Sequence, residues 1–161
     1  MPRQTISAFT GTFRFLSNFY PATAEYAGTL YPTAEHAYQA AKSLDPDVRR
    51  HFAMGGIYTT PGQAKRAGRR IALRGDWEQV KVEIMRAVLR SKFTRSHVLR
   101  IKLLDTYPAE LIEGNHWNDR YWGVCNGRGE NMLGKLLMEL RADLLINGSA
   151  PLTPSQRRAQ Q

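Results

Sequence analysis

A stretch at residues 31–44 constrains the fold more than any other part of the chain. It reads Tyr-Pro-Thr-Ala-Glu-His-Ala-Tyr-Gln-Ala-Ala-Lys-Ser-Leu. Pro32 and Thr33 are signals that start a helix, and Asp45-Pro46 ends it. One side of this predicted helix carries only alanines: Ala34, Ala37, Ala40 and Ala41. Because small side chains let a neighbouring element approach closely, we expect this helix to lie inside the protein.

The other side of the same helix carries four polar groups. These are Glu35, Tyr38, Gln39 and Lys42, at positions i, i+3, i+4 and i+7 on one face over two turns. A buried polar face must line a pocket or be paired internally, because unpaired polar groups are costly to bury. The alternative is an ordinary exposed helix that serves only solubility, and the spacing alone favours that plainer interpretation.

Two of these side chains have useful chemistry if the helix is buried. Glu35 lies in the first turn, where the helix dipole favours negative charge, so we expect an ionised carboxylate that can accept a proton or stabilise a cation. Lys42 becomes a usable nucleophile only if desolvation in a pocket lowers the pKa of its amine.

The size and composition of the chain are those of one soluble globular domain. It has 161 residues, of which 42% are hydrophobic and 23% charged. It contains neither an apolar run of membrane-spanning length nor a hydrophobic N-terminal signal, so we expect a cytoplasmic protein without a membrane partner. The only cysteine is Cys125 and the four histidines lack metal-ligand spacing, so we expect no disulfide, metal or cofactor.

The net charge of +9 and the pI of about 10.1 indicate anionic partners. Phosphorylated metabolites, nucleotides and nucleic acids all fit. A basic surface that only confers solubility fits equally well, and charge alone does not separate these possibilities.

The N-terminal half contains further recognisable elements. Residues 12–21 are rich in aromatics that we expect to fill the core, interrupted by Ser17 and Asn18, which could turn the chain or reach a ligand. Residues 23–26 and 29–31 predict a β-hairpin.

Asp45-Pro46 and Thr60-Pro61 start two helices. The second of these carries Lys65, Arg66, Arg69 and Arg70, of which some could meet phosphate and at least half are expected to be solvated.

The C-terminal half begins with the longest predicted helix, residues 77–93, capped by Asp76. Its expected buried stripe is Trp77, Val80, Ile84 and Val88, and Met85 and Leu89 are further candidates for the same stripe. Ser96 caps a helix over residues 97–104, and residues 110–113 predict a short strand. A leucine-rich amphipathic helix ends near residue 146. Arg128, between two glycines before that helix, could hold an anion, although helix entries often look like this.

Two other C-terminal segments stand out by composition. Residues 114–123 combine two tryptophans, a tyrosine, an aspartate and an arginine in a loop, which favours a functional role over packing. Residues 147–161 contain two prolines and Arg157-Arg158, so we expect a disordered basic tail after a domain at residues 1–146.

Taken together, four segments resemble the YbiA-like, or NADAR, family of N-glycosidases. The segments are residues 15–19 (Phe-Leu-Ser-Asn-Phe), 31–42, 76–78 (Asp-Trp-Glu), and 118–123 (Asn-Asp-Arg-Tyr-Trp-Gly) with 131–141. Their order and spacing also match, over about residues 10–146. The resemblance implies an α+β fold that is predominantly helical, in a single compact domain with a small β-hairpin or sheet.

The resemblance also implies which residues form the site. Glu35, Trp77, Asp119 and Trp122 match active-site positions of the family. Lys42 matches the lysine that, in the branch that removes ADP-ribose, is thought to form a transient Schiff base with the sugar. Asn18 and Arg69 are weaker matches, expected as ligand contacts. Tyr38, on the polar face of the same helix as Glu35, is a further expected substrate contact. Residues 115–117 and the basic tail depart from the family pattern, so recognition of the base could differ.

The activity implied by the family is hydrolysis of the bond between a ribose phosphate and a base. Members resembling this chain cleave ribosylaminopyrimidine 5′-phosphates of the riboflavin pathway and release ribose 5-phosphate, whereas other branches remove ADP-ribose from guanine in nucleic acid. Our hypothesis gives Glu35 and Asp119 the acid–base and cation-stabilising roles and Lys42 the nucleophilic one. Trp77 and Trp122 would shape the base site.

Two rival interpretations belong to other functional classes. A non-catalytic binder of NAD or ADP-ribose would use the same pocket, but it has little need of two carboxylates beside an anionic ligand. A plain nucleic-acid-binding protein would rely on the net charge and show steeply salt-dependent affinity, but the sequence contains no recognised nucleic-acid motif.

Overall fold

The computed structural model describes residues 4–148, which form mainly helices with a few short strands. The predominantly helical α+β class is therefore confirmed. The chain groups into two units, which we call the hairpin unit (residues 18–95) and the α6 unit (residues 4–17 and 96–148). The predicted tail lies outside the described residues apart from Asn147 and Gly148.

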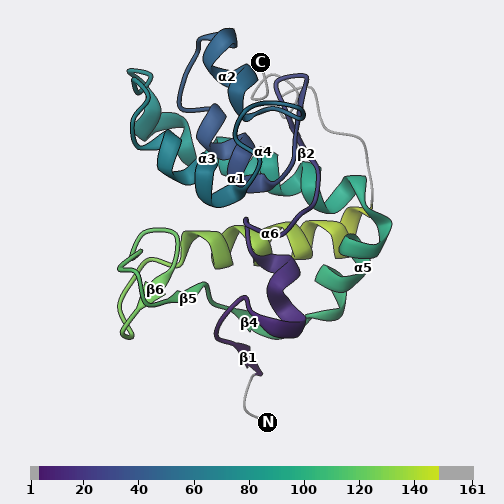
Figure 1. The fold of residues 1–161 in the computed structure, drawn as a ribbon. Helices are drawn as coiled ribbons and strands as arrows, with labels where there is room; N and C mark the ends of the chain where they lie inside the picture. Colours follow the sequence, from purple (N-terminus) through teal and green to yellow (C-terminus); the bar gives the residue numbers. More distant parts are fainter. Residues whose placement is uncertain (1–3, 149–161) are drawn as a thin grey trace. The chain divides into compact units, whose positions relative to one another are not determined.

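The hairpin unit contains a two-stranded antiparallel hairpin and four helices (Figure 1). The strands are β2 (Ala24–Tyr26) and β3 (Thr29–Tyr31), paired as the sequence predicts. The helices are α1 (Ala34–Ala40), α2 (Pro46–Phe52), α3 (Pro61–Gly68) and α4 (Trp77–Arg95).

Helix α1 lies at the centre of the hairpin unit. It contacts α2, α3, α4 and both strands of the hairpin. All seven of its residues are buried, including the polar Glu35 and Gln39. The prediction that this helix lies inside the protein is confirmed, and the alternative of an exposed helix is wrong.

The neighbouring helices begin where their capping residues predict. The Asp45 side chain accepts a hydrogen bond from the N–H of Asp47 at the start of α2. Thr60 and Gln63 form a reciprocal capping box at the start of α3. The Asp76 carboxylate was expected to cap α4, but it accepts hydrogen bonds from the Arg74 guanidinium. Along α4, Val80 is only half-buried, while the rest of the predicted stripe is buried.

The α6 unit is built around α6 (Met132–Asn147), drawn in yellow-green in Figure 1. Its other elements are β1 (Thr5–Ile6), the 3-10 helix η1 (Gly11–Leu16), α5 (His97–Asp105), β4 (Glu110–Leu111), β5 (Gly114–Asn115) and β6 (Val124–Cys125). Parallel pairs form between β1 and β4 and between β5 and β6. The predicted core face of α6 is buried, at Leu133, Leu136, Leu137, Leu140 and Leu144.

Polar side chains of α6 fasten the surrounding segments to it. Asn131 precedes the helix with a positive φ of 54°, donates to the carbonyl of Leu111 at 2.9 Å and accepts from the N–H of Glu113 at 3.0 Å. The buried Arg141 guanidinium donates to the Thr106 hydroxyl and the Ala109 carbonyl, both at 2.8 Å. Both ends of strand β4 are thereby fixed to α6.

Of the aromatic segment expected to fill the core, Phe15 is buried, while Phe13, Phe19 and Tyr20 are half-buried.

None of the helices within residues 4–148 has the length and apolar character that crossing a membrane requires.

Candidate active site

The polar face of α1 begins with a buried pair, Glu35 and Gln39. The Gln39 side-chain amide donates a 2.8 Å hydrogen bond from Nε2 to Oε1 of Glu35. The two residues are only 7% and 5% exposed. The main-chain N–H of Glu35 donates to the carbonyl of Asn18 at 3.1 Å, so the segment before the hairpin also holds this position.

Lys42 lies one turn beyond Tyr38, just after the end of α1, and is half-buried. Its Nζ atom is 5.8 Å from the centroid of the Tyr38 ring and 5.9 Å from that of the Trp77 ring. Those rings pack against each other at a centroid distance of 5.1 Å, and both are buried. The lysine amine therefore lies beside two buried aromatic rings.

This environment lowers the pKa of Lys42. Burial is the main cause, since it penalises the charged ammonium. The negative charge of Glu35 raises the pKa in part, whereas the positive charges of Arg69 and Lys65 lower it further. Desolvation thus lowers the pKa of the Lys42 amine as a nucleophilic lysine requires, and the nucleophilic role itself stays a prediction.

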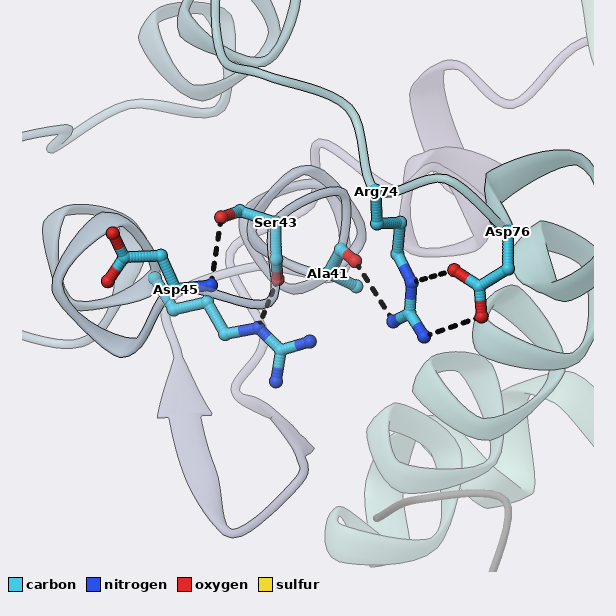
Figure 2. Close-up of polar contacts among 6 residues, drawn as sticks. Ala41, Ser43, Asp45, Arg74 and Asp76 are labelled. Carbon is cyan, nitrogen blue, oxygen red and sulfur yellow. Dashed lines mark hydrogen bonds and ion pairs between the residues drawn. The ribbon is translucent and has the colours of Figure 1, made fainter.

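Two arginines hold the main chain on either side of Lys42. The Arg74 guanidinium donates two hydrogen bonds to Asp76, of 2.6 and 3.0 Å, and a longer one of 3.5 Å to the carbonyl of Ala41 (Figure 2). The Arg49 Nε atom donates to the carbonyl of Ser43 at 2.7 Å. These contacts close off the carbonyl end of α1 and fix the segment that carries Lys42.

The hairpin unit thus brings together five of the predicted site residues: Asn18, Glu35, Tyr38, Lys42 and Trp77. Asn18 is buried, and its side-chain amide donates to the Met85 sulfur at 3.4 Å. Arg69 is the exposed residue at the end of α3 and acts on Lys42 through its charge.

Asp119 and Trp122 belong to the α6 unit, where Asp119 organises a tight turn. Its Oδ1 atom accepts hydrogen bonds from the N–H groups of Tyr121 at 3.2 Å and Trp122 at 2.9 Å. Asn115 clamps the same residue, accepting from its N–H at 3.0 Å and donating to its carbonyl at 2.8 Å. Asp119 therefore has a structural role in addition to any chemical one.

The segment that follows Asp119 covers the start of α6. The carbonyls of residues 120–123 accept hydrogen bonds from the N–H groups of residues 130–133, at 2.8 to 3.3 Å. Because these N–H groups already donate to carbonyls, they are not available to bind an anion beside Arg128. The Trp122 ring packs edge-on against Tyr121 at a centroid distance of 5.0 Å.

His36 has a structural role. Its ring is fully buried between the Thr33 hydroxyl, 2.7 Å from Nδ1, and the carbonyl of Tyr58, 2.9 Å from Nε2. Since a carbonyl only accepts, Nε2 carries the proton, and burial lowers the pKa of the ring. No group of three His, Cys, Asp or Glu side chains suited to a metal ion occurs in the described part of the chain.

Sequence reasoning missed three positions that shape this site. They are Arg74, Gln39 as the partner of Glu35, and Gly68, where a Cβ atom would collide with the Gln39 side chain. The helical spacing of Glu35 and Gln39 was a usable signal for their pairing. Arg74 and Gly68 act through contacts between elements that are distant in sequence, and no local pattern marks them.

Comparison with known proteins places this geometry in context. The model of the NADAR domain family matches residues 6–145, across both units. The chain is 44% identical over 133 residues to N-glycosidase YbiA of Shigella flexneri, covering 81% of each protein. It is 38% identical to a riboflavin biosynthesis protein of Vibrio vulnificus, of whose length it spans about a third (35%). The NMR structure of YbiA from Escherichia coli aligns with a TM-score of 0.79 and 39% identity, covering 96% of this chain and 93% of that one.

Proposed function

This chain belongs to the NADAR family and is an N-glycosidase, and we propose that it hydrolyses a ribosylaminopyrimidine 5′-phosphate to release ribose 5-phosphate. The observation that supports the hydrolytic chemistry is the Lys42 amine, desolvated beside Tyr38 and Trp77 and within the electrostatic reach of Glu35. The choice of substrate is supported by relatives named for riboflavin biosynthesis. An amine whose pKa is lowered by desolvation is better suited to attack on a sugar carbon than an ordinary lysine.

In the first step of the proposed reaction, the Lys42 nitrogen displaces the base: the bond from C1 of the ribose to the base breaks as the bond from C1 to the lysine nitrogen forms. The leaving nitrogen takes up a proton. The lysine nitrogen then loses a proton to the ring oxygen as the sugar opens, which leaves an imine. Water adds to the imine carbon, the amine is restored, and ribose 5-phosphate departs. The sum is hydrolysis: glycoside and water give ribose 5-phosphate and the free base.

Glu35 is assigned to the charge that develops during this reaction. Positive charge appears on C1 and the ring oxygen as the bond to the base breaks, and a fixed carboxylate stabilises it. Asp119 is assigned the second carboxylate role, that of moving protons to the leaving nitrogen or from water. That assignment rests on the family motif at residues 118–123.

Substrate contacts are assigned by residue chemistry. Trp77 and Trp122 offer indole surfaces for the base, with the Tyr38 phenol beside Trp77, and Arg69 offers an exposed guanidinium for the phosphate. Asn18 offers an acceptor: its Oδ1 atom is buried and receives no hydrogen bond from any described residue. A buried acceptor without a hydrogen bond costs free energy, and a substrate hydroxyl or amine that donates to Oδ1 would remove this cost.

The riboflavin-pathway substrate is favoured by relatives that are named for riboflavin biosynthesis. The Vibrio vulnificus protein that contains a region 38% identical to this chain is named for riboflavin biosynthesis. An N-glycosidase region within such a protein would meet phosphorylated ribosylamines, which have the labile C–N bond that this chemistry needs.

The deciding experiment gives purified protein two substrates in parallel. One is a ribosylaminopyrimidine 5′-phosphate and the other is DNA carrying ADP-ribosylated guanine. Ribose 5-phosphate from the first alone supports the proposal. ADP-ribose from the second alone would overturn it in favour of action on nucleic acid, which the net charge of +9 would suit. Tight ADP-ribose binding with no product from either substrate would indicate a binding module.

The residue assignments have their own tests. Glu35→Gln should abolish turnover while the fold persists. Near-normal turnover would contradict the assignment of Glu35 to the charge on C1. Borohydride reduction during turnover should attach a sugar phosphate to the protein, located at Lys42 by peptide mass mapping, and Lys42→Met should abolish the adduct.

A further inference from the structure

We propose that Gln39 is a positioning residue that holds the Glu35 carboxylate in its working orientation, and that Gly68 leaves the space Gln39 needs. This inference deepens the proposed function and rests on its assignment of Glu35. It concerns three residues on two packed helices, α1 and α3.

The orientation of the Gln39 side chain follows from its partner. The amino end of the Gln39 amide faces Glu35 and donates from Nε2 to Oε1 of its carboxyl group at 2.8 Å. The other end, Oε1 of Gln39, is buried and accepts no hydrogen bond within residues 4–148. An orphaned buried acceptor is costly. The amide is therefore held in the orientation that serves Glu35 although its own oxygen goes unsatisfied.

Gly68 makes this placement possible. A Cβ atom on Gly68 would lie 1.8 Å from Oε1 of Gln39 and 2.6 Å from its Cδ, far closer than atoms can approach. The need for glycine thus comes from space, because Gly68 ends a right-handed helix and its φ is not positive.

Two substitutions of Gln39 separate positioning from packing. Gln39→Met keeps the length of the side chain and removes the donor, and it should lower kcat about tenfold to hundredfold with little change in KM. Gln39→Glu places two carboxylates within hydrogen-bonding distance, which then share a proton, so the acid limb of the kcat profile should move to higher pH. Variants with wild-type kcat and an unmoved limb would overturn the proposal.

Gly68→Ala tests the space requirement, and Gly62→Ala on the same helix is the matched control. A Cβ at Gly62 meets only the end of the Arg66 side chain, at an ordinary 3.6 Å. Gly68→Ala should lower kcat and Gly62→Ala should not. If Gly68 acts through Gln39, Gly68→Ala should have little further effect when added to Gln39→Ala. Fully additive losses would show that Gly68 acts by another route.

A measurement without substrate keeps this inference separable from the proposed function. The Glu35 carboxyl carbon can be followed by NMR titration of ¹³C-glutamate protein, with the signal assigned by Glu35→Gln. Loss of the Gln39 donor should raise the pKa of Glu35 in Gln39→Met, because a hydrogen bond to the carboxylate favours its charged form. An unchanged titration would contradict the positioning role, whereas absence of ribose 5-phosphate from the wild-type protein would contradict only the proposed function.

Discussion

The main-chain N–H of Arg74 donates a 2.8 Å hydrogen bond to the carbonyl of Lys42. The carbonyl of Arg74 in turn accepts from the N–H of Trp77 at 3.3 Å, and its guanidinium is bound to Asp76 (Figure 2). Arg74 consequently joins the segment that carries the reactive lysine to the helix start that carries one of its aromatic neighbours.

We expect Arg74→Ala to reduce kcat by roughly tenfold, because the placement of Lys42 beside Trp77 would loosen. Arg74→Lys should recover only part of the loss, since an ammonium cannot make the two parallel bonds of a guanidinium. Arg50→Ala is the matched control, because Arg50 pairs with Asp47 on the exposed surface of α2. Steady-state kinetics would check this, and equal effects of Arg74→Ala and Arg50→Ala would contradict it.

The positive charge of Arg69 should set part of the pH dependence of Lys42. Arg69 lowers the pKa of the Lys42 amine, so Arg69→Gln should raise that pKa. Because the neutral amine is the nucleophile, the rate of borohydride-trapped adduct formation should then rise at higher pH than in the wild type. Arg70→Gln, which changes the adjacent exposed residue, should leave the curve in place. Added salt should shrink the effect, since Arg69 is exposed to solvent. A shift to lower pH in Arg69→Gln would contradict the electrostatic account.

Much of this arrangement could be predicted from local sequence. Thr33 as the helix cap, the alanine side of α1 and the polar side with Glu35 and Lys42 all follow from residue type and helical spacing, and the structure confirms a buried helix with Thr33 accepting from the N–H of His36. The spacing alone left open whether the polar side of α1 is buried or exposed. The burial of Glu35 and Gln39 rules out the exposed helix that would serve only solubility.

Contacts between distant segments were beyond such reasoning. Asp76 has the pattern of a helix cap, yet the guanidinium of Arg74 captures its carboxylate, and local propensity gives no sign of that competition. Gly68 looks like an ordinary helix end, and only the packing of α3 against α1 shows that a side chain there would collide with Gln39. Asp119 reads as a candidate catalytic carboxylate, and its role in shaping the turn before Trp122 emerges only from the folded loop.

Lys42 should lower the stability of the fold at neutral pH. Burial lowers its pKa, so the native state binds a proton less readily than the unfolded chain, and stability falls as the pH drops below the ordinary lysine pKa of about 10.4. Lys42→Met should therefore unfold at higher denaturant concentration than the wild type at pH 7, with the difference shrinking as the pH rises toward 10.4. Chemical denaturation at several pH values would measure this. A less stable Lys42→Met at neutral pH would mean that the charged amine stabilises the native state.

Asp119 has a structural role that a pair of substitutions can separate from its proposed chemistry. Asn at position 119 retains an oxygen that can accept from the N–H groups of Tyr121 and Trp122, whereas Ala removes it. Asp119→Asn should keep the thermal stability close to that of the wild type, while Asp119→Ala should destabilise the protein by about 1–3 kcal/mol through the two unsatisfied amides.

Turnover by Asp119→Asn then decides whether the charge of this carboxylate matters. If Asp119 moves protons in the reaction, Asp119→Asn should lose about a hundredfold or more in kcat although its turn is intact. Thermal melts and steady-state kinetics on the same preparations would show both effects. Wild-type kcat in Asp119→Asn together with a damaged Asp119→Ala would assign the residue to the turn alone, because only the acceptor oxygen would then be needed. Glu35 would in that case remain as the carboxylate assigned to the charge on C1.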